Sequence, residues 1–251
     1  MKLYSTNNKD YTVDLKTAVL NSLPPDSGLY LPTLIPKLSP EMLSGLSNFS
    51  FQEIALEISR SLLEDSLTES EILTLVSKSI DFPAPVVELD KQTYILELFH
   101  GPSLAFKDFG ARYMSQLMGL LNQGEDKELT ILVATSGDTG GAVAAGFYDT
   151  PGIKVHILYP SGKVSALQEK QLTTLGKNIH AFEVDGTFDD CQSIVKQAFL
   201  DDQLNQRYRL SSANSINIAR LIPQSFYYFE AYKQVAHKGL PVVFTVPSGN
   251  F

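Results

Sequence analysis

The feature that most constrains the fold is a change of hydrophobic rhythm near residue 91. Beyond it, short apolar runs rich in β-forming residues alternate with amphipathic stretches, and glycine or proline marks the joints. This alternation predicts an α/β fold, with mostly parallel sheets and helices on both faces. The expected strands are residues 93–98, 129–135, 153–159, 179–184 and 242–246, and the expected helices are residues 110–121, 140–148, 165–175, 188–200 and 216–236.

The first part of the chain has a different pattern. Residues 51–58 and 70–76 carry apolar residues at helical spacing, and prolines at positions 24, 25, 83 and 85 mark turns. The pattern predicts a small, mainly helical N-terminal lobe over residues 1–90, followed by the α/β region over residues 91–251. Nothing in the sequence of the lobe indicates chemistry.

Composition and charge exclude several classes of protein. Of 251 residues, 43% are hydrophobic, which is enough for one large core or two modest ones. The net charge is −8, and no basic stripe indicates a nucleic-acid groove. The sequence shows neither a signal peptide nor an apolar run long enough to span a membrane. The single cysteine, Cys191, cannot form an internal disulfide, and we expect a soluble, cytoplasmic protein.

A lysine lies in an apolar stretch just after the first of the expected strands. Lys107 is flanked by Leu104, Ala105, Phe106 and Phe109, and apolar surroundings favour the neutral amine that a Schiff-base lysine needs. A lysine beside aromatic rings is also typical of a surface residue with a buried stem, so both interpretations stay open at this point.

Three joints have sequences that suit an anion. Residues 134–141 (ATSGDTGG) follow a strand and open a helix, where free backbone N–H groups bind anions. Residues 212–220 (SANSINIAR) combine a helix start with Arg220, and residues 247–251 (PSGNF) form another turn. Each joint also fits a plain turn or a capped helix. In the first joint, Ser136 or Thr139 would cap the helix that follows. Taken together, the lysine and the joints fit pyridoxal phosphate with a phosphorylated amino acid.

Five blocks of sequence, in their order and spacing, resemble the threonine synthase family. The blocks are residues 100–110 (HGPSLAFKDFG), 134–140, 158–163 (LYPSGK), 212–220 and 246–251. The resemblance runs along the whole chain, and it implies a pyridoxal-phosphate enzyme of the tryptophan-synthase-β-like fold (fold type II). Enzymes of this family convert O-phospho-L-homoserine and water to L-threonine and phosphate.

The resemblance also implies which residues hold the cofactor. Lys107 would form the Schiff base and carry protons to and from the substrate. Asp138 would face the 3′-oxygen of the cofactor, an arrangement in which a carboxylate and a phenolate must share a proton. The loop that holds the cofactor phosphate would begin at Gly249, Asn250 and Phe251.

The substrate residues follow from the same resemblance. Thr135 and Ser136 would bind the substrate carboxylate. The substrate phosphate would lie on Thr139, Asn214, Ser215 and Arg220. Ser103 and Lys163 lie in matching blocks, and the resemblance implies no role for either.

Members of the family are longer than this chain, so the resemblance implies an N-terminal portion with little activity of its own. Two other interpretations stay open. Another enzyme of the same fold, such as a phospholyase or a serine/threonine dehydratase, would keep the lysine but release ammonia with a ketoacid or an aldehyde. A non-catalytic module that binds a small molecule or phosphate would not form the Schiff base. The sequence predicts no metal site, and it leaves the oligomeric state open.

Overall fold

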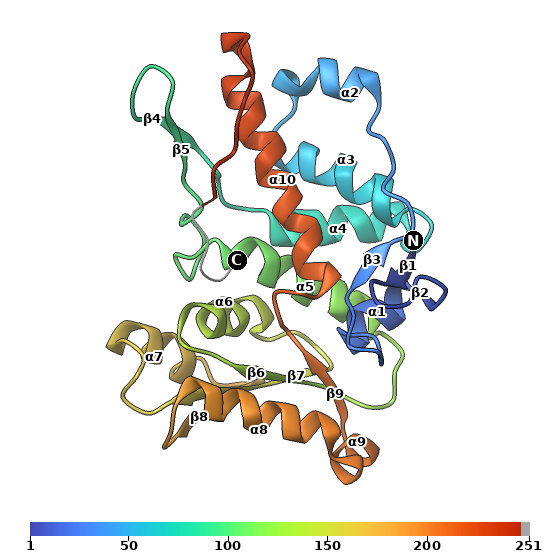
Figure 1. Ribbon diagram of the computed structural model, residues 1–251, viewed down its shortest axis with the longest axis vertical. Helices are drawn as coiled ribbons and strands as arrows, with labels where there is room; N and C mark the ends of the chain where they lie inside the picture. Colours follow the sequence, from blue (N-terminus) through green and yellow to red (C-terminus); the bar gives the residue numbers. More distant parts are fainter. Residues whose placement is uncertain (247–251) are drawn as a thin grey trace.

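The computed structural model describes residues 1–246, and its main sheet has four parallel strands, which lie in the lower part of the view in Figure 1. The strand order is β8-β7-β6-β9. The strands are β6 (Leu129–Ala134), β7 (Ile153–Pro160), β8 (Ile179–Val184) and β9 (Arg209–Ser212). β6 is central, because it pairs with β7 on one side and with β9 on the other. The prediction of an α/β fold with a mostly parallel sheet is confirmed.

Helices lie on both faces of this sheet, as the alternating pattern predicted. α6 (Asp138–Phe147) lies on one face and α8 (Phe188–Leu200) on the other (Figure 1). α5 (Lys107–Leu121) and α10 (Ile218–Val235) pack against each other above α6, and α7 (Ala166–Thr173) contacts α6 and β8. The short α9 (Asp202–Arg207) leads into β9, and a 3-10 turn, η2 (Ala236–Lys238), follows α10. Within residues 1–246 no helix is long and apolar enough to cross a membrane.

The N-terminal segment contains strands as well as helices. Its helices are α1 (Leu15–Asn21), α2 (Pro40–Ser44), η1 (Leu46–Asn48), α3 (Phe51–Leu63) and α4 (Glu69–Ser79). β1 (Lys2–Ser5) pairs antiparallel with β2 (Thr12–Asp14) and β3 (Tyr30–Pro32). The sequence pattern does not reveal this sheet, because strands of three or four residues are too short to show alternation. Capping boxes start α3 at Ser50 and α4 at Thr68.

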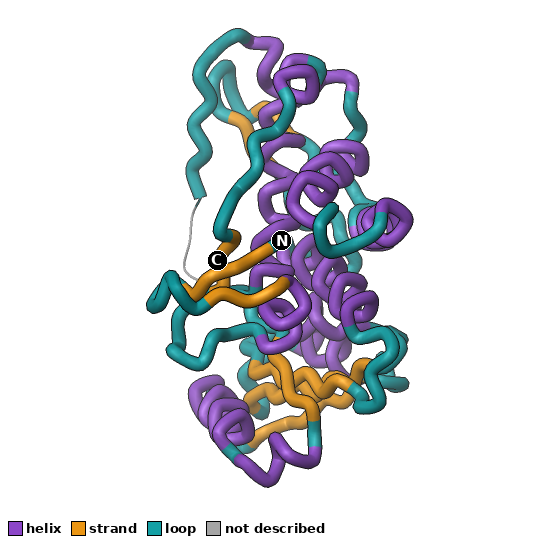
Figure 2. The backbone as a smooth tube through the Cα atoms, turned by 90° about the vertical axis from the view of Figure 1, so that its right-hand side faces the viewer, coloured by secondary structure: helices purple, strands orange, loops and turns teal. Residues whose placement is uncertain are grey.

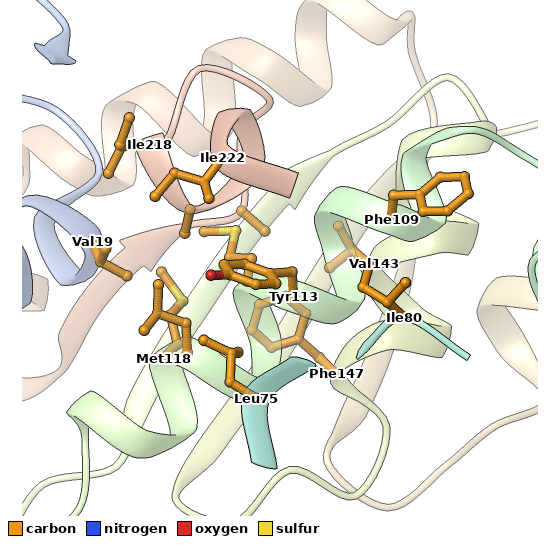
Figure 3. Close-up of a cluster of buried hydrophobic side chains, with 14 of the residues drawn as sticks. Val19, Leu75, Ile80, Phe109, Tyr113, Met118, Val143, Phe147, Ile218 and Ile222 are labelled. Carbon is orange, nitrogen blue, oxygen red and sulfur yellow. The ribbon is translucent and has the colours of Figure 1, made fainter. Parts of the chain in front are cut away.

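One apolar core runs through both parts of the chain. Leu75 and Ile80 belong to the same buried cluster as Tyr113 of α5 and Ile222 of α10 (Figure 3). In Figure 2 most of the helices stack side by side above the strands of the main sheet. The hydroxyl of Tyr113 lies 2.9 Å from that of Ser59 in α3, so a buried polar contact also joins the N-terminal segment to α5. The domain boundary expected at residue 90 stays a prediction.

Two of the expected strands are not part of the parallel sheet. Residues 93–98 contribute β5 (Tyr94–Leu96), which pairs antiparallel with β4 (Val86–Glu88) because the chain turns back at Asp90. Residues 242–246 form no strand, since no strand of the described chain pairs with them. Side chains that favour β-structure do not by themselves supply hydrogen-bond partners for the backbone N–H and C=O groups. The fourth strand is β9, which the apolar pattern missed because Arg209 and two serines interrupt it.

Gly146 sets the distance between α5 and α6. A Cβ built on Gly146 lies 2.9 Å from the backbone carbonyl carbon of Ala111, so the helices meet backbone to backbone. We expect Gly146→Ala to lower the free energy of unfolding by about 1–3 kcal/mol, because overpacking outweighs the better helix propensity of alanine. The matched control is Gly119→Ala in α5, whose added carbon lies 3.4 Å from the Thr150 side chain, an ordinary contact. Urea unfolding measures both variants, and equal stabilities would contradict the close approach.

Candidate active site at the carboxyl edge of the sheet

The parallel sheet brings two of the predicted anion-binding joints together. Leu132 of β6 pairs with Ser212 of β9, so the loops that follow these strands begin side by side. The first loop leads into α6 and the second leads into α10, so both helices start at this edge. Ligands of open parallel sheets bind at the carboxyl edge, where such loops meet. The third predicted joint, with Gly249, Asn250 and Phe251, lies outside the described residues.

Lys107 is the first residue of α5, three residues before the predicted helix start. Its side chain is buried, and its Nζ lies 4.7 Å from the centroid of the Phe106 ring. No polar group within residues 1–246 accepts a hydrogen bond from this Nζ. Burial lowers the pKa of Lys107, the Asp138 carboxylate opposes this shift, and the Arg220 guanidinium adds to it. Lys107 therefore lies within electrostatic reach of two other predicted site residues.

Thr135 holds the first loop in place. Its buried Oγ1 accepts hydrogen bonds from the N–H groups of Gly137 at 2.9 Å and Gly140 at 2.8 Å. Neither Ser136 nor Thr139 caps α6, so the alternative that assigned the cap to one of them is wrong. The loop needs glycine at both bonded positions: Gly137 has φ 140°, and a Cβ on Gly140 would lie 2.5 Å from the Thr135 methyl carbon. Ser136 is left exposed and Thr139 half-buried.

Asp138 has a partner that the sequence analysis missed. Its Oδ1 accepts a hydrogen bond of 2.7 Å from Nε2 of Gln168, near the start of α7. The Oε1 atom of Gln168 closes a capping box with Ser165. The Ser-x-x-Gln spacing could have identified this helix start. It could not have shown that the same side chain also reaches α6.

The second loop is two residues longer than predicted, because the side chain of Asn217 caps α10 and the helix begins at Ile218. Asn214 is exposed and Ser215 is half-buried, so the structure leaves both side chains at the surface of the loop. Asn214 Oδ1 accepts hydrogen bonds from the hydroxyl of Ser215 at 3.3 Å and from the N–H of Ile216 at 3.4 Å.

Arg220 lies under this loop and is 1% exposed. Its Nη1 donates to the carbonyl oxygen of Ala213 at 2.8 Å, whereas its buried Nε has no hydrogen-bond partner in the described part of the chain. Burial lowers the pKa of Arg220 to about 10, and the Asp108 carboxylate opposes the shift. A Cβ on Gly110 would lie 2.7 Å from Nε, so glycine lets the first turns of α5 approach the guanidinium.

Asp108 is a second residue that the sequence analysis missed. It is fully buried, and it accepts hydrogen bonds from the N–H of Ser103 at 2.9 Å and from its hydroxyl at 2.6 Å. Burial raises the pKa of Asp108, although the bonds from Ser103 act in the other direction. These bonds close the turn before Lys107, in which Leu104 has φ 60°. An acidic residue inside an apolar stretch was the only available signal.

A cavity of about 1030 Å³ lies next to this site rather than in it. It is bounded by β4, β5, α10 and residues 240–246, and Phe106 borders it. None of the described residues in the loops after β6 and β9 lines it. Its lining is mainly apolar, and its two charged residues, Lys91 and Lys238, are not among the predicted site residues. Lys163, in the turn after β7, is exposed.

Comparison with known proteins identifies the family. Residues 80–251, more than half of the chain, match the family model described as "Pyridoxal-phosphate dependent enzyme". The chain belongs to the pyridoxal-phosphate dependent enzymes. Residues 2–80 match a second model, described as "Threonine synthase N terminus". The resemblance to threonine synthases recognised in the sequence is confirmed.

Relatives of this pyridoxal-phosphate dependent enzyme include threonine synthases from several organisms. Those of Buchnera aphidicola (subsp. Baizongia pistaciae) and Escherichia coli are each 45% identical to it over 100% of the chain. The chain spans 59% and 58% of their lengths.

Solved structures extend the comparison. Threonine synthase from Escherichia coli covers 96% of the chain with a TM-score of 0.84 at 44% identity. The pyridoxal-phosphate-bound threonine synthase from Brucella melitensis covers all of it with a TM-score of 0.93 at 36% identity. The chain corresponds to 55% of each of these two relatives. Diaminopropionate ammonia lyase from Escherichia coli, at 17% identity and a TM-score of 0.51, shares the fold alone.

The groups at the carboxyl edge suit the cofactor of this family. A buried lysine with a lowered pKa and no polar partner within residues 1–246 suits an aldehyde. The unpartnered Nε of Arg220 suits an anionic group, and so does the positive end of the α6 dipole. The roles assigned to individual residues stay predictions.

The electrostatics around Lys107 lead to a testable order of pKa values. We expect the Lys107 amine to titrate below the ordinary lysine value of about 10.4, because burial disfavours its charged form. Asp138→Asn should lower this pKa further, since it removes the carboxylate that favours the ammonium ion. Acylation rates at each lysine as a function of pH, resolved by peptide mapping, measure the effect.

Lys154 serves as the internal control for this titration. Its hydrogen bond to Glu128 raises its pKa, so Glu128→Gln should lower the pKa of Lys154 and leave that of Lys107 unchanged. If Asp138→Asn left the pKa of Lys107 at its wild-type value, the two groups would not be close.

Proposed function

We propose that this protein, at its full natural length, is a threonine synthase that uses pyridoxal phosphate to convert O-phospho-L-homoserine and water to L-threonine and phosphate. The state of Lys107 carries the proposal: a buried lysine whose amine has no polar partner among residues 1–246, at the edge where the loops after β6 and β9 meet. Identity of 45% to threonine synthases along the whole chain supports this particular reaction. The cytoplasmic location expected from the sequence stays a prediction.

Lys107 would hold the cofactor through its ε-nitrogen. Burial lowers its pKa, so a neutral amine is more readily available to join the aldehyde carbon with loss of water. Bound pyridoxal phosphate supplies an electron-accepting ring, which makes it feasible to remove a proton from the carbon beside the substrate amino group. Asp138 is the residue proposed to lie near the 3′-oxygen, and Gly249, Asn250 and Phe251 are proposed to hold the phosphate.

Thr135 and Ser136 would bind the substrate carboxylate. The Thr135 oxygen accepts two backbone N–H bonds, so its own proton remains available for a carboxylate oxygen. The Ser136 hydroxyl is exposed on the same loop. Both groups are at the start of α6, where the helix dipole also favours a negative charge.

Arg220 would be the main partner of the substrate phosphate, together with Thr139, Asn214 and Ser215. Its guanidinium is buried, so its charge is poorly screened by water, and one of its N–H donors is unpartnered within residues 1–246. A guanidinium in this state stabilises a phosphate most as the phosphate leaves and gains charge.

The overall reaction moves protons that Lys107 is positioned to carry. The bond between the γ carbon and the phosphate oxygen breaks, and the phosphate keeps the electron pair. One proton leaves the β carbon and one is delivered to the γ carbon, which becomes a methyl group. Water supplies the hydroxyl of the β carbon, and its remaining proton accompanies the phosphate. A general acid–base group must therefore serve several neighbouring carbons, as a flexible amine can.

Borohydride reduction tests the assignment of the lysine. Reduction of the full-length protein after incubation with pyridoxal phosphate turns the C=N bond into a stable amine, which peptide mapping locates. We expect the pyridoxyl group on Lys107, and we expect Lys107→Ala to remove both this label and the absorbance band near the visible. Lys163→Ala, an exposed lysine in another matching block, is the control and should keep both. A label on a different lysine, or none, would overturn the assignment.

The products separate the proposed reaction from those of other enzymes of this fold. With O-phospho-L-homoserine we expect threonine and phosphate in equal amounts, because water adds to the β carbon and the amino group is retained. A phospholyase or a dehydratase would release ammonia with 2-oxobutyrate or an aldehyde instead. Amino-acid chromatography with phosphate and ammonia assays distinguishes these outcomes, and a non-catalytic binding module would form no product.

A further inference from the structure

A buried polar network joins the N-terminal segment to the loop after β9. The hydroxyl of Ser22, just after α1, donates to the carbonyl oxygen of Ser212 at 2.6 Å. The Nδ2 group of Asn217 donates to the Ser22 hydroxyl and to the carbonyl oxygen of Val19, both at 2.8 Å. Ser22 is 3% exposed and Asn217 is 0% exposed, so water does not compete for these bonds.

Ser22 is held in a strained backbone conformation. It has φ 65° and ψ −43°, and the N–H of Leu23 donates to the carbonyl oxygen of Asn21 at 2.7 Å. Residues 21–23 therefore form a γ-turn with positive φ, a rare conformation that glycine adopts with less strain. Such strain persists where the surroundings hold it, and it is common at functional sites. A serine here indicates that its hydroxyl does something that glycine could not do.

The network holds both ends of the loop that carries Asn214 and Ser215. Ser22 binds Ser212, the last residue of β9. Asn217 closes the other end, since its Oδ1 accepts the N–H of Ala219 at 2.9 Å and its own N–H donates to the carbonyl oxygen of Asn214 at 3.1 Å. The position of the loop thus depends on side chains anchored against α1, in the N-terminal segment.

We propose that Ser22 and Asn217 are positioning residues for this loop. They set where Asn214 and Ser215 lie relative to Arg220, and through them the N-terminal segment determines how tightly the site holds the phosphate end of the substrate. The inference rests on the proposed function, which assigns the phosphate to this loop. Ser22 and Asn217 act through the loop and need not touch the substrate.

Ser22→Gly separates positioning from stability. Glycine accepts positive φ with less strain, which offsets part of the stability lost with the two buried hydrogen bonds of the hydroxyl, so we expect the variant to fold. We also expect it to bind inorganic phosphate about three- to tenfold more weakly, the factor that corresponds to one ordinary hydrogen bond. Ser27→Gly is the matched control: Ser27 has φ 62° in the same segment, is exposed, and has no hydrogen bond to residues 212–217. It should leave phosphate binding unchanged.

Kinetics of the full-length protein provide the second readout. In Ser22→Gly we expect KM for O-phospho-L-homoserine and the inhibition constant of inorganic phosphate to rise together. We expect the borohydride label on Lys107 to stay unchanged, because Ser22 acts on the loop assigned to the substrate phosphate and not on the lysine. If Ser22 had a purely structural role, Ser22→Gly would lower the midpoint of unfolding, and its KM would equal that of the wild type.

Asn217→Ser tests the other half of the network. Serine can still cap α10, but the two Nδ2 hydrogen bonds are lost. Asn217→Ser should also weaken phosphate binding. In the double variant, the loss of affinity should be smaller than the product of the two single losses, because both residues act on one loop.

The wild-type protein separates failure of the proposed function from failure of the inference. If the wild type makes no threonine, the proposed function is contradicted, and if it also binds no phosphate, the inference is contradicted as well. An active wild type with unaltered phosphate binding in Ser22→Gly contradicts the positioning role alone.

Discussion

The parallel pairing of β6 with β9 is the constraint on which the candidate site depends. Neighbouring strands lie about 4.8 Å apart, so two loops that are distant in the sequence begin side by side. One loop carries Thr135 and Asp138, and the other carries Asn214 and leads to Arg220. α5 precedes β6 and begins at the same edge, so that Lys107 lies within electrostatic reach of residues from both loops. Without this pairing the two loops would not begin side by side.

Burial of unpaired cations gives this edge its chemical character. Lys107 has no polar partner within residues 1–246, and the Arg220 guanidinium has one carbonyl partner and an unpartnered Nε. Burying charge in this way costs stability, and a bound ligand with negative groups offsets the cost. The same burial lowers the pKa of both side chains. Stability is thus given up where bound anionic groups would restore it, as is expected of a functional site.

The N-terminal segment is part of the same structure as the site. Its side chains share one core with α5 and α10 (Figure 3), and Ser22 reaches the end of β9. Two non-glycine residues with positive φ flank the site, Leu104 before α5 and Ser22 after α1. Each lies beside a buried hydrogen-bonded group, Asp108 in the first case and Asn217 in the second. Such bonds can maintain conformations that local preference would not choose.

The sequence by itself determined the α/β class, the longer helices and most of the parallel strands, because alternation and helical period are local properties of the chain. It also singled out Lys107 and the two described joints, whose residue types suit the chemistry. Only the tertiary structure decided that β5 pairs with β4, that β9 completes the sheet, and that Asn217 caps α10. It alone revealed the bonds of Asp108 and Gln168. Strand partners and buried hydrogen bonds join residues that are distant in sequence or lie beyond a turn, and their free energy depends on packing that no local pattern records.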